Sequence, residues 1–264
     1  MRKRALNLRS LPGEAPSSPT EGRVIYAIGD VHGRYELLKT LLTKILTDCQ
    51  ESSPGERPMI VFCGDYVDRG NQSAEVLEAL IWLKQRADVE VHTLMGNHEQ
   101  ALKQFLDSPE ETRGWLRFGG SATLTSYGVR SPQSDDDLPG LVAARDSLKE
   151  RMPASHAQFL EELELMLVVG DYAFVHAGVR PGVPLAQQEE ADLLWIRDEF
   201  LSAKGPFEKV IVHGHSWSGP AQVLKHRVGL DTGAYATGVL TAARLHDGAV
   251  RLLDTSGGIG AYAL

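Results

Sequence analysis

The sequence has few cysteines: only Cys49 and Cys63 occur among its 264 residues. Cys63 lies inside an apolar run and Cys49 lies at the end of a helical pattern, so a disulfide framework is excluded as the basis of the fold. Cysteine usage of this kind is typical of proteins in a reducing compartment. We therefore expect two free thiols and a cytoplasmic protein.

Long apolar stretches are also absent. No apolar segment approaches the roughly 20 residues that a membrane-spanning helix needs. The chain begins with the basic residues Met1-Arg2-Lys3-Arg4, but proline and serine follow them instead of the apolar core of a secretory signal. We expect residues 1–22 to form a disordered tail, because chain ends of this composition are usually mobile. We also expect a soluble protein without a membrane partner.

Basic charge is in short supply. The chain has 27 Lys and Arg residues against 35 Asp and Glu residues, which gives a net charge of −8. A broad nucleic-acid surface needs a basic face, so nucleic acid is not an expected partner. The hydrophobic content of 42% is ample for a core, and the length is at the upper end of a single domain. The sequence does not indicate an oligomeric state.

Three apolar runs in the first half of the chain are each followed by a turn rich in glycine and polar side chains. The runs are residues 24–28, 59–63 and 89–94, and the turns are Gly29-Asp30-Val31-His32-Gly33, Gly64-Asp65-Tyr66-Val67-Asp68-Arg69-Gly70 and Gly96-Asn97-His98-Glu99. The runs resemble buried strands, and apolar residues at helical spacing follow the first two turns. This order predicts an α/β fold, whose parallel strands bring polar residues to a crevice at their carboxyl ends. We therefore expect the three turns to converge.

The second half of the chain adds two strand ends that carry histidine. A β-hairpin is predicted from the runs 165–169 and 172–175, and it ends at His176. A later run, residues 210–212, leads into His213-Gly214-His215-Ser216. A single histidine in such a place is more often a hydrogen-bonded core residue, but five polar turns in the same topological position favour ligands. Four other histidines lack this context and are interpreted as structural: His92, His156, His226 and His246.

Five segments occur in a fixed order over about residues 23–255: GDVHG, GDYVDRG, GNHE, HAG and HGHS. Five blocks in order are very hard to obtain by chance. Together they resemble the phosphoprotein phosphatase family of calcineurin-like binuclear metallophosphoesterases. Two later segments, residues 195–201 and 229–234, are similar to small bacterial-type Ser/Thr phosphatases, and diadenosine tetraphosphate hydrolases share the main motifs. The resemblance implies an α/β fold for residues 23–264, a β-sandwich flanked by helices in four αββα layers.

Residues 107–163 have a helical, acidic and turn-rich sequence, which we interpret as a helical cap inserted in that catalytic domain. Trp115, Arg113 and Arg117 could contact substrate from the cap, although packing within a helical hairpin is the stronger interpretation. The acidic run Asp135-Asp136-Asp137 is interpreted as a solvated loop, since consecutive carboxylates seldom all face one ion.

The resemblance implies two divalent metal ions held by six side chains: Asp30, His32, Asp65, Asn97, His176 and His215. Within that set Asp65 would bridge the two ions. Mixed oxygen and imidazole ligands suit manganese, iron or zinc better than calcium, and manganese is expected first. The HGHS segment also offers His213, but the position after Gly214 matches the family's ligand and favours His215.

The resemblance further implies hydrolysis of a phosphoester by direct attack of a hydroxide that bridges the metals. His98, paired with Asp68, would protonate the leaving group as a general acid. Arg69 and Arg197, together with Asn97, would bind the phosphate oxygens of the substrate. No covalent phosphoenzyme is required by this scheme.

Three functions fit this site. A phosphatase acting on phosphoserine or phosphothreonine of proteins, and on small phosphoesters, is expected first. A dinucleoside polyphosphate hydrolase is the alternative, because it differs only in the cap and surface, where the sequence is least informative. An inactive scaffold or binding protein is a third, but such proteins typically lose a ligand or the general acid, and here every matched position is present. Trp217 stands where nuclease relatives often carry another histidine, which favours the phosphatase branch.

Overall fold

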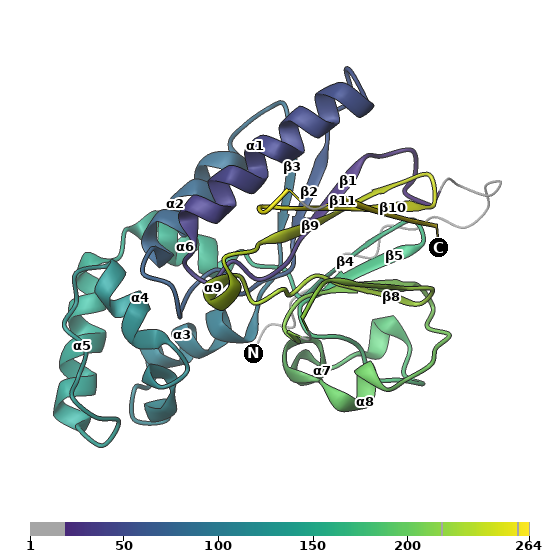
Figure 1. Cartoon of the computed structure of the whole chain (residues 1–264). Helices are drawn as coiled ribbons and strands as arrows, with labels where there is room; N and C mark the ends of the chain where they lie inside the picture. Colours follow the sequence, from purple (N-terminus) through teal and green to yellow (C-terminus); the bar gives the residue numbers. More distant parts are fainter. Residues whose placement is uncertain (1–18, 218, 258, 264) are drawn as a thin grey trace.

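The computed structural model of the chain describes residues 19–217, 219–257 and 259–263 (Figure 1). Six of its strands form one sheet in the order β11-β10-β9-β1-β2-β3. These strands are β1 (Ile25–Ile28), β2 (Met59–Phe62), β3 (Glu90–Thr93), β9 (Thr241–His246), β10 (Ala249–Asp254) and β11 (Ile259–Ala263). The three strands predicted in the first half pair in parallel, whereas β9 to β11 pair antiparallel. The polar turns after β1, β2 and β3 therefore share one edge of the sheet.

A second sheet has the order β4-β5-β6-β8-β7. Its strands are β4 (Met166–Val169), β5 (Tyr172–Val175), β6 (Val210–His213), β7 (Gln222–Leu224) and β8 (Arg227–Gly229). The antiparallel pair β4 and β5 is the predicted hairpin, which turns at Gly170 and Asp171. Strands β5 and β6 are parallel, so the histidines that follow them leave the sheet at the same end.

The two sheets pack face to face, and strand β1 shows why. Ile25 and Ala27 lie in the core between the sheets, whereas Tyr26 and Ile28 lie in the core under the helices. Side chains of a strand alternate between faces, so an apolar run of this kind is buried on both sides. All four side chains are fully buried.

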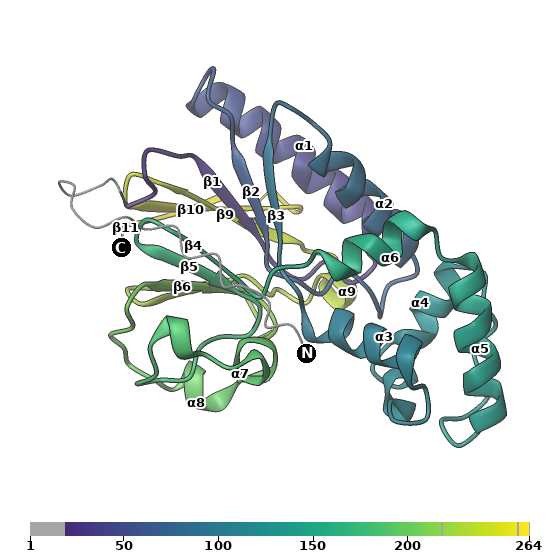
Figure 2. The same cartoon turned by 180° about the vertical axis from the view of Figure 1, so that it is seen from behind.

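Helices cover both outer faces. Helices α1 (Tyr35–Ser52) and α2 (Ser73–Lys84) lie on the first sheet, and α1 buries Leu38, Leu41, Ile45 and Cys49 at helical spacing. The short helices α7 (Glu190–Trp195) and α8 (Asp198–Leu201) lie on the second sheet, with Leu193 and Phe200 in its outer core. The views in Figures 1 and 2 agree on these four layers, which confirms the predicted αββα sandwich.

Residues 107–163 form helices beside the sandwich. The region follows α3 (Asn97–Asp107) and contains the 3₁₀ turn η1 (Arg113–Leu116), α4 (Gly120–Ser126), α5 (Leu138–Arg151) and α6 (Ala154–Glu161). Helices α4 and α6 pack on α2, and α5 packs on α3. Figures 1 and 2 show α4 and α5 projecting to one side of the sheets. In the acidic loop before α5, Asp137 accepts a hydrogen bond from the Gly140 N–H and caps the helix.

The remaining short elements are η2 (Leu185–Gln187) and α9 (Ala234–Thr237), which follows β8. Of the predicted tail, residues 1–18 lie outside the described residues. Residues 19–22 pack against the β4–β5 hairpin: the Asp171 N–H donates to the Pro19 carbonyl at 2.8 Å, and the Thr20 side chain is fully buried. Cys49 and Cys63 are buried free thiols. Within the described part of the chain, no helix is long and apolar enough to cross a membrane.

Candidate metal centre

The polar turns after β1, β2, β3, β5 and β6 meet at one end of the sandwich, as the strand pattern predicts. The turns carry all six side chains predicted to bind metal: Asp30, His32, Asp65, Asn97, His176 and His215. Each of these side chains is at most 7% exposed. Such burial of charged and imidazole groups requires partners, so their mutual contacts decide what the site can hold.

His32 and His176 flank the carboxylate of Asp65. The His32 Nδ1–H donates to the Val67 carbonyl at 2.9 Å, and the His176 Nδ1–H donates to the Cys63 carbonyl at 2.8 Å. Both rings therefore present an Nε2 lone pair, 3.5 Å from Asp65 Oδ2 and 3.4 Å from Asp65 Oδ1, respectively. An imidazole whose second nitrogen is fixed by a backbone carbonyl is the usual arrangement of a metal-binding histidine.

Asn97 brings His176 and His215 together. The Asn97 Oδ1 lies 2.9 Å from His176 Nε2 and 2.8 Å from His215 Nδ1. Separations near 3 Å fit neighbouring ligands of one ion whose bonds are about 2.0–2.2 Å long. Ligand atoms of Asp65, His176 and His215 lie within 4.8 Å of one another, and so do those of His32, Asp65 and His98. Asp65 is therefore shared by two groups of potential ligands.

Asp30 reaches the centre from the turn after β1. Its Oδ2 lies 4.0 Å from His32 Nε2, and both carboxylate oxygens accept hydrogen bonds from the His215 N–H, at 3.0 and 3.1 Å. His213, the alternative to His215 in the sequence, lies elsewhere: its ring contacts Phe200 on the outer face of the second sheet, with centroids 5.0 Å apart. Of these two histidines, the structure brings His215 into the cluster.

The protonation of the three imidazoles suits metal binding. Burial lowers the pKa of His32 to about 3 and that of His215 to about 2, and it also lowers the pKa of His176. These rings are therefore neutral at physiological pH, which is the form that binds a metal ion. His32 Nε2 and His215 Nε2 are buried and have no hydrogen-bond partner.

Three buried carboxylates lie close enough to influence one another: Asp30, Asp65 and Asp231. Burial raises the pKa of Asp30 well above its usual range, and the charges of Asp231 and Asp65 add to this effect. Burial also raises the pKa of Asp231. For Asp65, burial alone would raise the pKa, but the surrounding histidines, His176 first, outweigh it and lower the pKa. Divalent cations would offset the negative charge, so the donor set fits two such ions.

Backbone strain is concentrated at the same place. Five residues of the centre have positive φ angles: His32 (45°), Asp65 (55°), Asp68 (70°), Arg69 (66°) and His215 (61°). Each such residue costs of order 1–3 kcal/mol and persists where the surrounding structure fixes it. Gly96 shows how tightly the turns approach, since a Cβ at this position would lie 2.2 Å from Asp65 Oδ1.

Glu99 fixes the strained turn after β2, a role that the sequence did not predict. Its buried carboxylate accepts hydrogen bonds from the N–H groups of Asp65 (2.9 Å), Tyr66 (2.7 Å), Val67 (3.1 Å) and Gly96 (3.0 Å). Burial, with the charge of Asp65, raises the Glu99 pKa to about 8. The available signal was its place as the third residue of α3, where an acid can close a capping box.

His98 faces the centre but is tied to a different carboxylate. Its Nδ1–H donates to Asp68 Oδ2 at 2.7 Å, and its Nε2 lies 3.9 Å from Asp65 Oδ2. Burial alone would lower the His98 pKa, but the carboxylates of Asp65 and Asp68 outweigh it and raise the pKa. The ring can therefore present a proton on Nε2 toward the centre, as a general acid requires.

Two arginines border the centre. The Arg69 guanidinium lies 4.6 Å over the ring of Tyr235, and its Nη2 lies 3.3 Å from His98 Nε2. Arg197 is exposed, and its charge adds to burial in lowering the pKa values of His176 and His215. The centre thus has a cationic group on the His98 side and another near the His176 and His215 pair.

The cap residues named from the sequence have other partners. Trp115 is 3% exposed, and its indole N–H donates to Asp68 Oδ2 at 2.8 Å. Arg117 is ion-paired with Asp135, and the Arg113 side chain donates to the Glu110 carbonyl at 3.1 Å. Trp115 therefore contacts the buried carboxylate of Asp68, whereas the sequence also allowed a direct substrate contact.

Two half-exposed tryptophans lie beside the centre. Trp195 is 49% exposed; its ring lies 6.4 Å from that of His215, and its indole N–H donates to Gln100 Oε1 at 2.7 Å. Trp217 is 47% exposed and lies 6.4 Å from the ring of Tyr235. Tyr235 itself contacts both His32 and Arg69. An accessible indole therefore lies on the His215 side of the centre (Trp195), and another lies near Tyr235 on the His32 side (Trp217).

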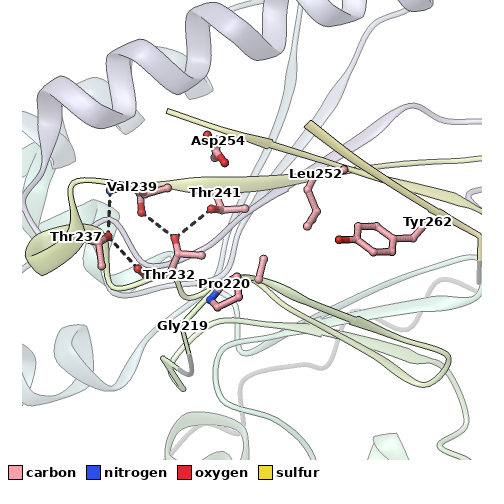
Figure 3. A pocket seen from close by; sticks show the side chains of 11 residues that line it. Gly219, Pro220, Thr232, Thr237, Val239, Thr241, Leu252, Asp254 and Tyr262 are labelled. Atoms are coloured by element: carbon pink, nitrogen blue, oxygen red, sulfur yellow. Dashed lines mark hydrogen bonds between the residues drawn. The ribbon is translucent and has the colours of Figure 1, made fainter. Parts of the chain in front are cut away.

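A separate pocket of about 470 Å³ opens between the ends of the two sheets (Figure 3). Threonines line it and bind one another: Thr232 Oγ1 donates to the Val239 carbonyl at 2.7 Å and pairs with Thr241 Oγ1 at 3.1 Å. None of its lining residues is among the six side chains predicted to bind metal.

A family model described as calcineurin-like phosphoesterase matches residues 23–231. The Shewanella-like protein phosphatase 2 of Arabidopsis thaliana is 28% identical over 202 residues, which are 66% of this chain and 50% of that protein. The asymmetrical bis(5'-nucleosyl)-tetraphosphatase PrpE of Bacillus mycoides is 24% identical over 233 residues, 82% of this chain and 88% of that protein. The chain spans about half the length of the plant relative, and 46% of a symmetrical bis(5'-nucleosyl)-tetraphosphatase from Janthinobacterium.

Among solved structures, the crystal structure of a proposed diadenosine tetraphosphatase superimposes with a TM-score of 0.58. The match covers 93% of this chain and 95% of the other at 19% sequence identity. At this identity the likeness concerns the fold, and it agrees with the helix-flanked pair of sheets described above.

Proposed function

The chain belongs to the calcineurin-like phosphoesterase family, and on that premise we propose that it hydrolyses phosphoesters with two divalent metal ions held around Asp65. One observation carries this proposal: the two oxygens of Asp65 each face a lone pair, His32 Nε2 at 3.5 Å and His176 Nε2 at 3.4 Å. A carboxylate between two fixed imidazoles can bridge a pair of ions, and paired ions about 3.5–4 Å apart recur in phosphoester-cleaving enzymes.

The proposed ligands divide into two groups. Asp30, His32 and Asp65 would hold one ion, and Asp65, Asn97, His176 and His215 would hold the other. When bound, the two ions neutralise phosphate charge and lower the pKa of water at the site. Manganese is the first candidate, with iron and zinc as alternatives, because the donors are oxygen atoms and neutral imidazoles.

The chain's own residues bind the phosphate and move the proton. We assign Arg69 and Arg197 to the non-bridging phosphate oxygens, where a guanidinium can donate two parallel hydrogen bonds. The amide group of Asn97 is assigned a second role there. As water attacks phosphorus and the bond to the leaving oxygen breaks, His98 Nε2 donates its proton to that oxygen, and Asp68 holds the ring in place.

We propose phosphoserine and phosphothreonine side chains of proteins as the first substrate class. The supporting observations are the Ser/Thr phosphatase names among the relatives and the exposed position of Arg197, which a bulky phosphoprotein can reach. A scaffold protein without activity is disfavoured, because the six ligands, the acid pair and both arginines are all present.

Dinucleoside polyphosphates are the second candidate, and two observations favour them. The chain matches the Bacillus tetraphosphatase over 88% of that protein's length. In addition, Trp195 and Trp217 offer exposed rings beside the centre, and aromatic rings of this kind stack with nucleobases.

The test compares two substrates in the presence of manganese. Phosphate release from a phosphoserine peptide and nucleotide release from diadenosine tetraphosphate are measured with and without a chelator. Hydrolysis that the chelator abolishes supports a metal-dependent phosphoesterase, and the ratio of the two rates decides the substrate class. Chelator-insensitive hydrolysis, or no hydrolysis of either substrate with added manganese, iron or zinc, would overturn the proposal.

A further inference from the structure

The carboxylate of Asp68 is fully buried and is held by three donors. His98 Nδ1–H donates to Oδ2 at 2.7 Å, Trp115 Nε1–H donates to the same oxygen at 2.8 Å, and Thr123 Oγ1–H donates to Oδ1 at 2.6 Å. Only the first of these donors belongs to the proposed reaction. The other two donors belong to the inserted segment, residues 107–163. Trp115 lies 47 residues and Thr123 lies 55 residues after Asp68 in the chain.

The indole of Trp115 is placed too tightly to have another partner. Its ring packs against that of Phe105, with centroids 4.4 Å apart. The ring also lies against Gly120, where a Cβ would come within 2.4 Å of it. An indole has a single N–H donor and no acceptor, so its one hydrogen bond is the bond to Asp68. The packing therefore directs this donor at the carboxylate.

Thr123 binds the same residue twice. Its hydroxyl donates to the Asp68 carboxylate and accepts a hydrogen bond from the Asp68 N–H at 2.9 Å. The Ser73 hydroxyl lies 3.2 Å from the Thr123 hydroxyl and from the Asp68 N–H. Asp68 has a φ angle of 70°, a strained conformation that these contacts hold in place.

The same stretch of chain also supports the phosphate-binding arginine. The Gly119 carbonyl accepts a hydrogen bond from the Arg69 N–H at 3.2 Å. Residues 115–123 thus contact Asp68 and Arg69, which are adjacent in sequence and have different proposed tasks. Residues 115–123 therefore contact two residues of the proposed active site directly.

We propose that Trp115 and Thr123 are positioning residues of the general acid: their two donors fix the Asp68 carboxylate, which orients His98 so that Nε2 points at the leaving-group oxygen. This inference rests on the proposed phosphoesterase function and adds residues to it. Loss of either donor leaves the Asp68 carboxylate with two of its three hydrogen bonds, so its orientation is less well fixed, and small displacements of a positioned group reduce proton transfer.

The inference predicts a dependence on the leaving group. An alkoxide, as released from phosphoserine, departs only with a proton, whereas p-nitrophenolate departs readily without one. Trp115→Phe keeps the ring and removes the donor, and Thr123→Val keeps the shape and removes the hydroxyl. We expect each variant to lose about 10- to 100-fold in kcat on a phosphoserine peptide and less than about threefold on p-nitrophenyl phosphate, with little change in KM.

The experiment uses the full chain with manganese and includes Trp82→Phe as the matched control, because Trp82 is an exposed tryptophan on α2. The double variant Asp68→Asn, Trp115→Phe is expected to lose no more activity than Asp68→Asn alone. A second readout needs no metal: the downfield NMR resonance of the His98 Nδ1 proton should shift in Trp115→Phe and Thr123→Val and remain unchanged in Trp82→Phe.

Equal losses on both phosphate esters, or additive losses in the double variant, would show a merely structural role and overturn the inference. Unchanged kinetics and an unchanged proton resonance would overturn it as well. These outcomes can be told apart from failure of the proposed function. If the proposed function is wrong, the wild-type chain hydrolyses neither ester with added metal. In that case the inference fails together with its premise.

Discussion

The Nδ1 of His98 lies 2.7 Å from Oδ2 of Asp68, and both side chains are buried at the end of the sandwich. Asp68 is fully buried and His98 is 4% exposed, so the pair is shielded from bulk water. A carboxylate so placed keeps the proton on Nδ1 and leaves Nε2 to act on a ligand in the centre. The first prediction tests this division of tasks.

Replacing His98 with Asn should lower the hydrolysis rate by about 10²- to 10⁴-fold, the range expected for loss of a general acid. Metal content, measured by plasma mass spectrometry, should stay at two ions per chain, because His98 is assigned no ligand role. His98 does lie near Asp65 and His32 in one of the two potential ligand groups. Loss of an ion from the variant would therefore reassign His98 as a ligand.

Replacing Asp65 with Asn should weaken both metal sites together, because Asp65 is shared by both ligand groups. The amide keeps the size of the side chain but lacks the charge that a bridge between two cations needs. Anomalous scattering from manganese-soaked crystals measures the two occupancies separately. Two fully occupied ions in this variant would show that the bridge is assigned wrongly. Asp136→Asn, at an exposed position of the loop before α5, serves as the control.

His92 gives a prediction about stability and pH that does not involve the metal centre. Its Nδ1 lies 3.1 Å from Glu164 and its Nε2 lies 3.2 Å from Glu90. Burial alone would lower the His92 pKa, but these two carboxylates outweigh it and raise the pKa. Because the folded pKa is above the unfolded value of about 6.5, the stabilisation is complete below pH 6.5 and is lost as the pH rises through the folded pKa.

His92→Gln should therefore reduce the free energy of unfolding by about 1 kcal/mol or less at pH 6 and by clearly less at pH 9. Urea denaturation of the wild type and the variant at both pH values measures the difference. A deficit that is larger at pH 9 than at pH 6 would reverse the sign argued here. The sequence interpretation of His92 as a structural residue agrees with its position between the two glutamates.

The side chains of the centre could be predicted from the sequence because each one follows a short apolar run at a glycine-containing turn. Parallel strands then bring such turns to one edge, so His32, Asp65 and Asn97 converge although about 65 residues separate the first from the last. The four layers could be predicted through the family resemblance. The boundaries of β7 to β11 could not be predicted in this way, because these strands carry no comparable turn motif.

The contacts that hold Asp68 and the turn at Asp65 could not be predicted from the sequence, for a physical reason. Trp115 and Thr123 reach Asp68 through packing of the inserted helices, and no local periodicity reports which donor meets a distant carboxylate. Glu99 lay in a recognised segment, yet its role depends on the strained turn at Asp65 that its carboxylate binds. The choice of His215 over His213 came from the family resemblance, and the structure agrees with it: His213 packs against Phe200, whereas His215 lies beside Asn97.

Replacing Arg69 with Ala should weaken phosphate binding. A charge-assisted hydrogen bond is worth about 1.5–3 kcal/mol, so the inhibition constant of inorganic phosphate should rise about 10- to 150-fold. The guanidinium packs over Tyr235 and near His98, which positions it toward the centre. Arg117→Ala is the control, because Arg117 is paired with Asp135 on the cap. Equal inhibition constants for the wild type and Arg69→Ala would remove Arg69 from the phosphate site.

The exposed tryptophans separate the two substrate classes. If Trp195 and Trp217 stack with nucleobases, replacing either with Leu should lower kcat/KM for diadenosine tetraphosphate about 5- to 150-fold, since stacking on one base is worth about 1–3 kcal/mol. Activity on a phosphoserine peptide, which has no base to stack, should change by less than about twofold. Both indoles are about half exposed, so neither substitution opens a core cavity.

Trp82→Leu provides the matched control for these two variants, because Trp82 is 56% exposed and lies on α2 with its ring near Arg86. Its replacement should change neither activity, while any general loss of stability from removing a surface indole would appear in all three proteins. Steady-state kinetics on both substrates gives the comparison. If Trp195→Leu and Trp217→Leu lose equal activity on the peptide and on the dinucleotide, these rings shape the centre itself. The argument for nucleotide substrates would then rest on the tetraphosphatase relatives alone.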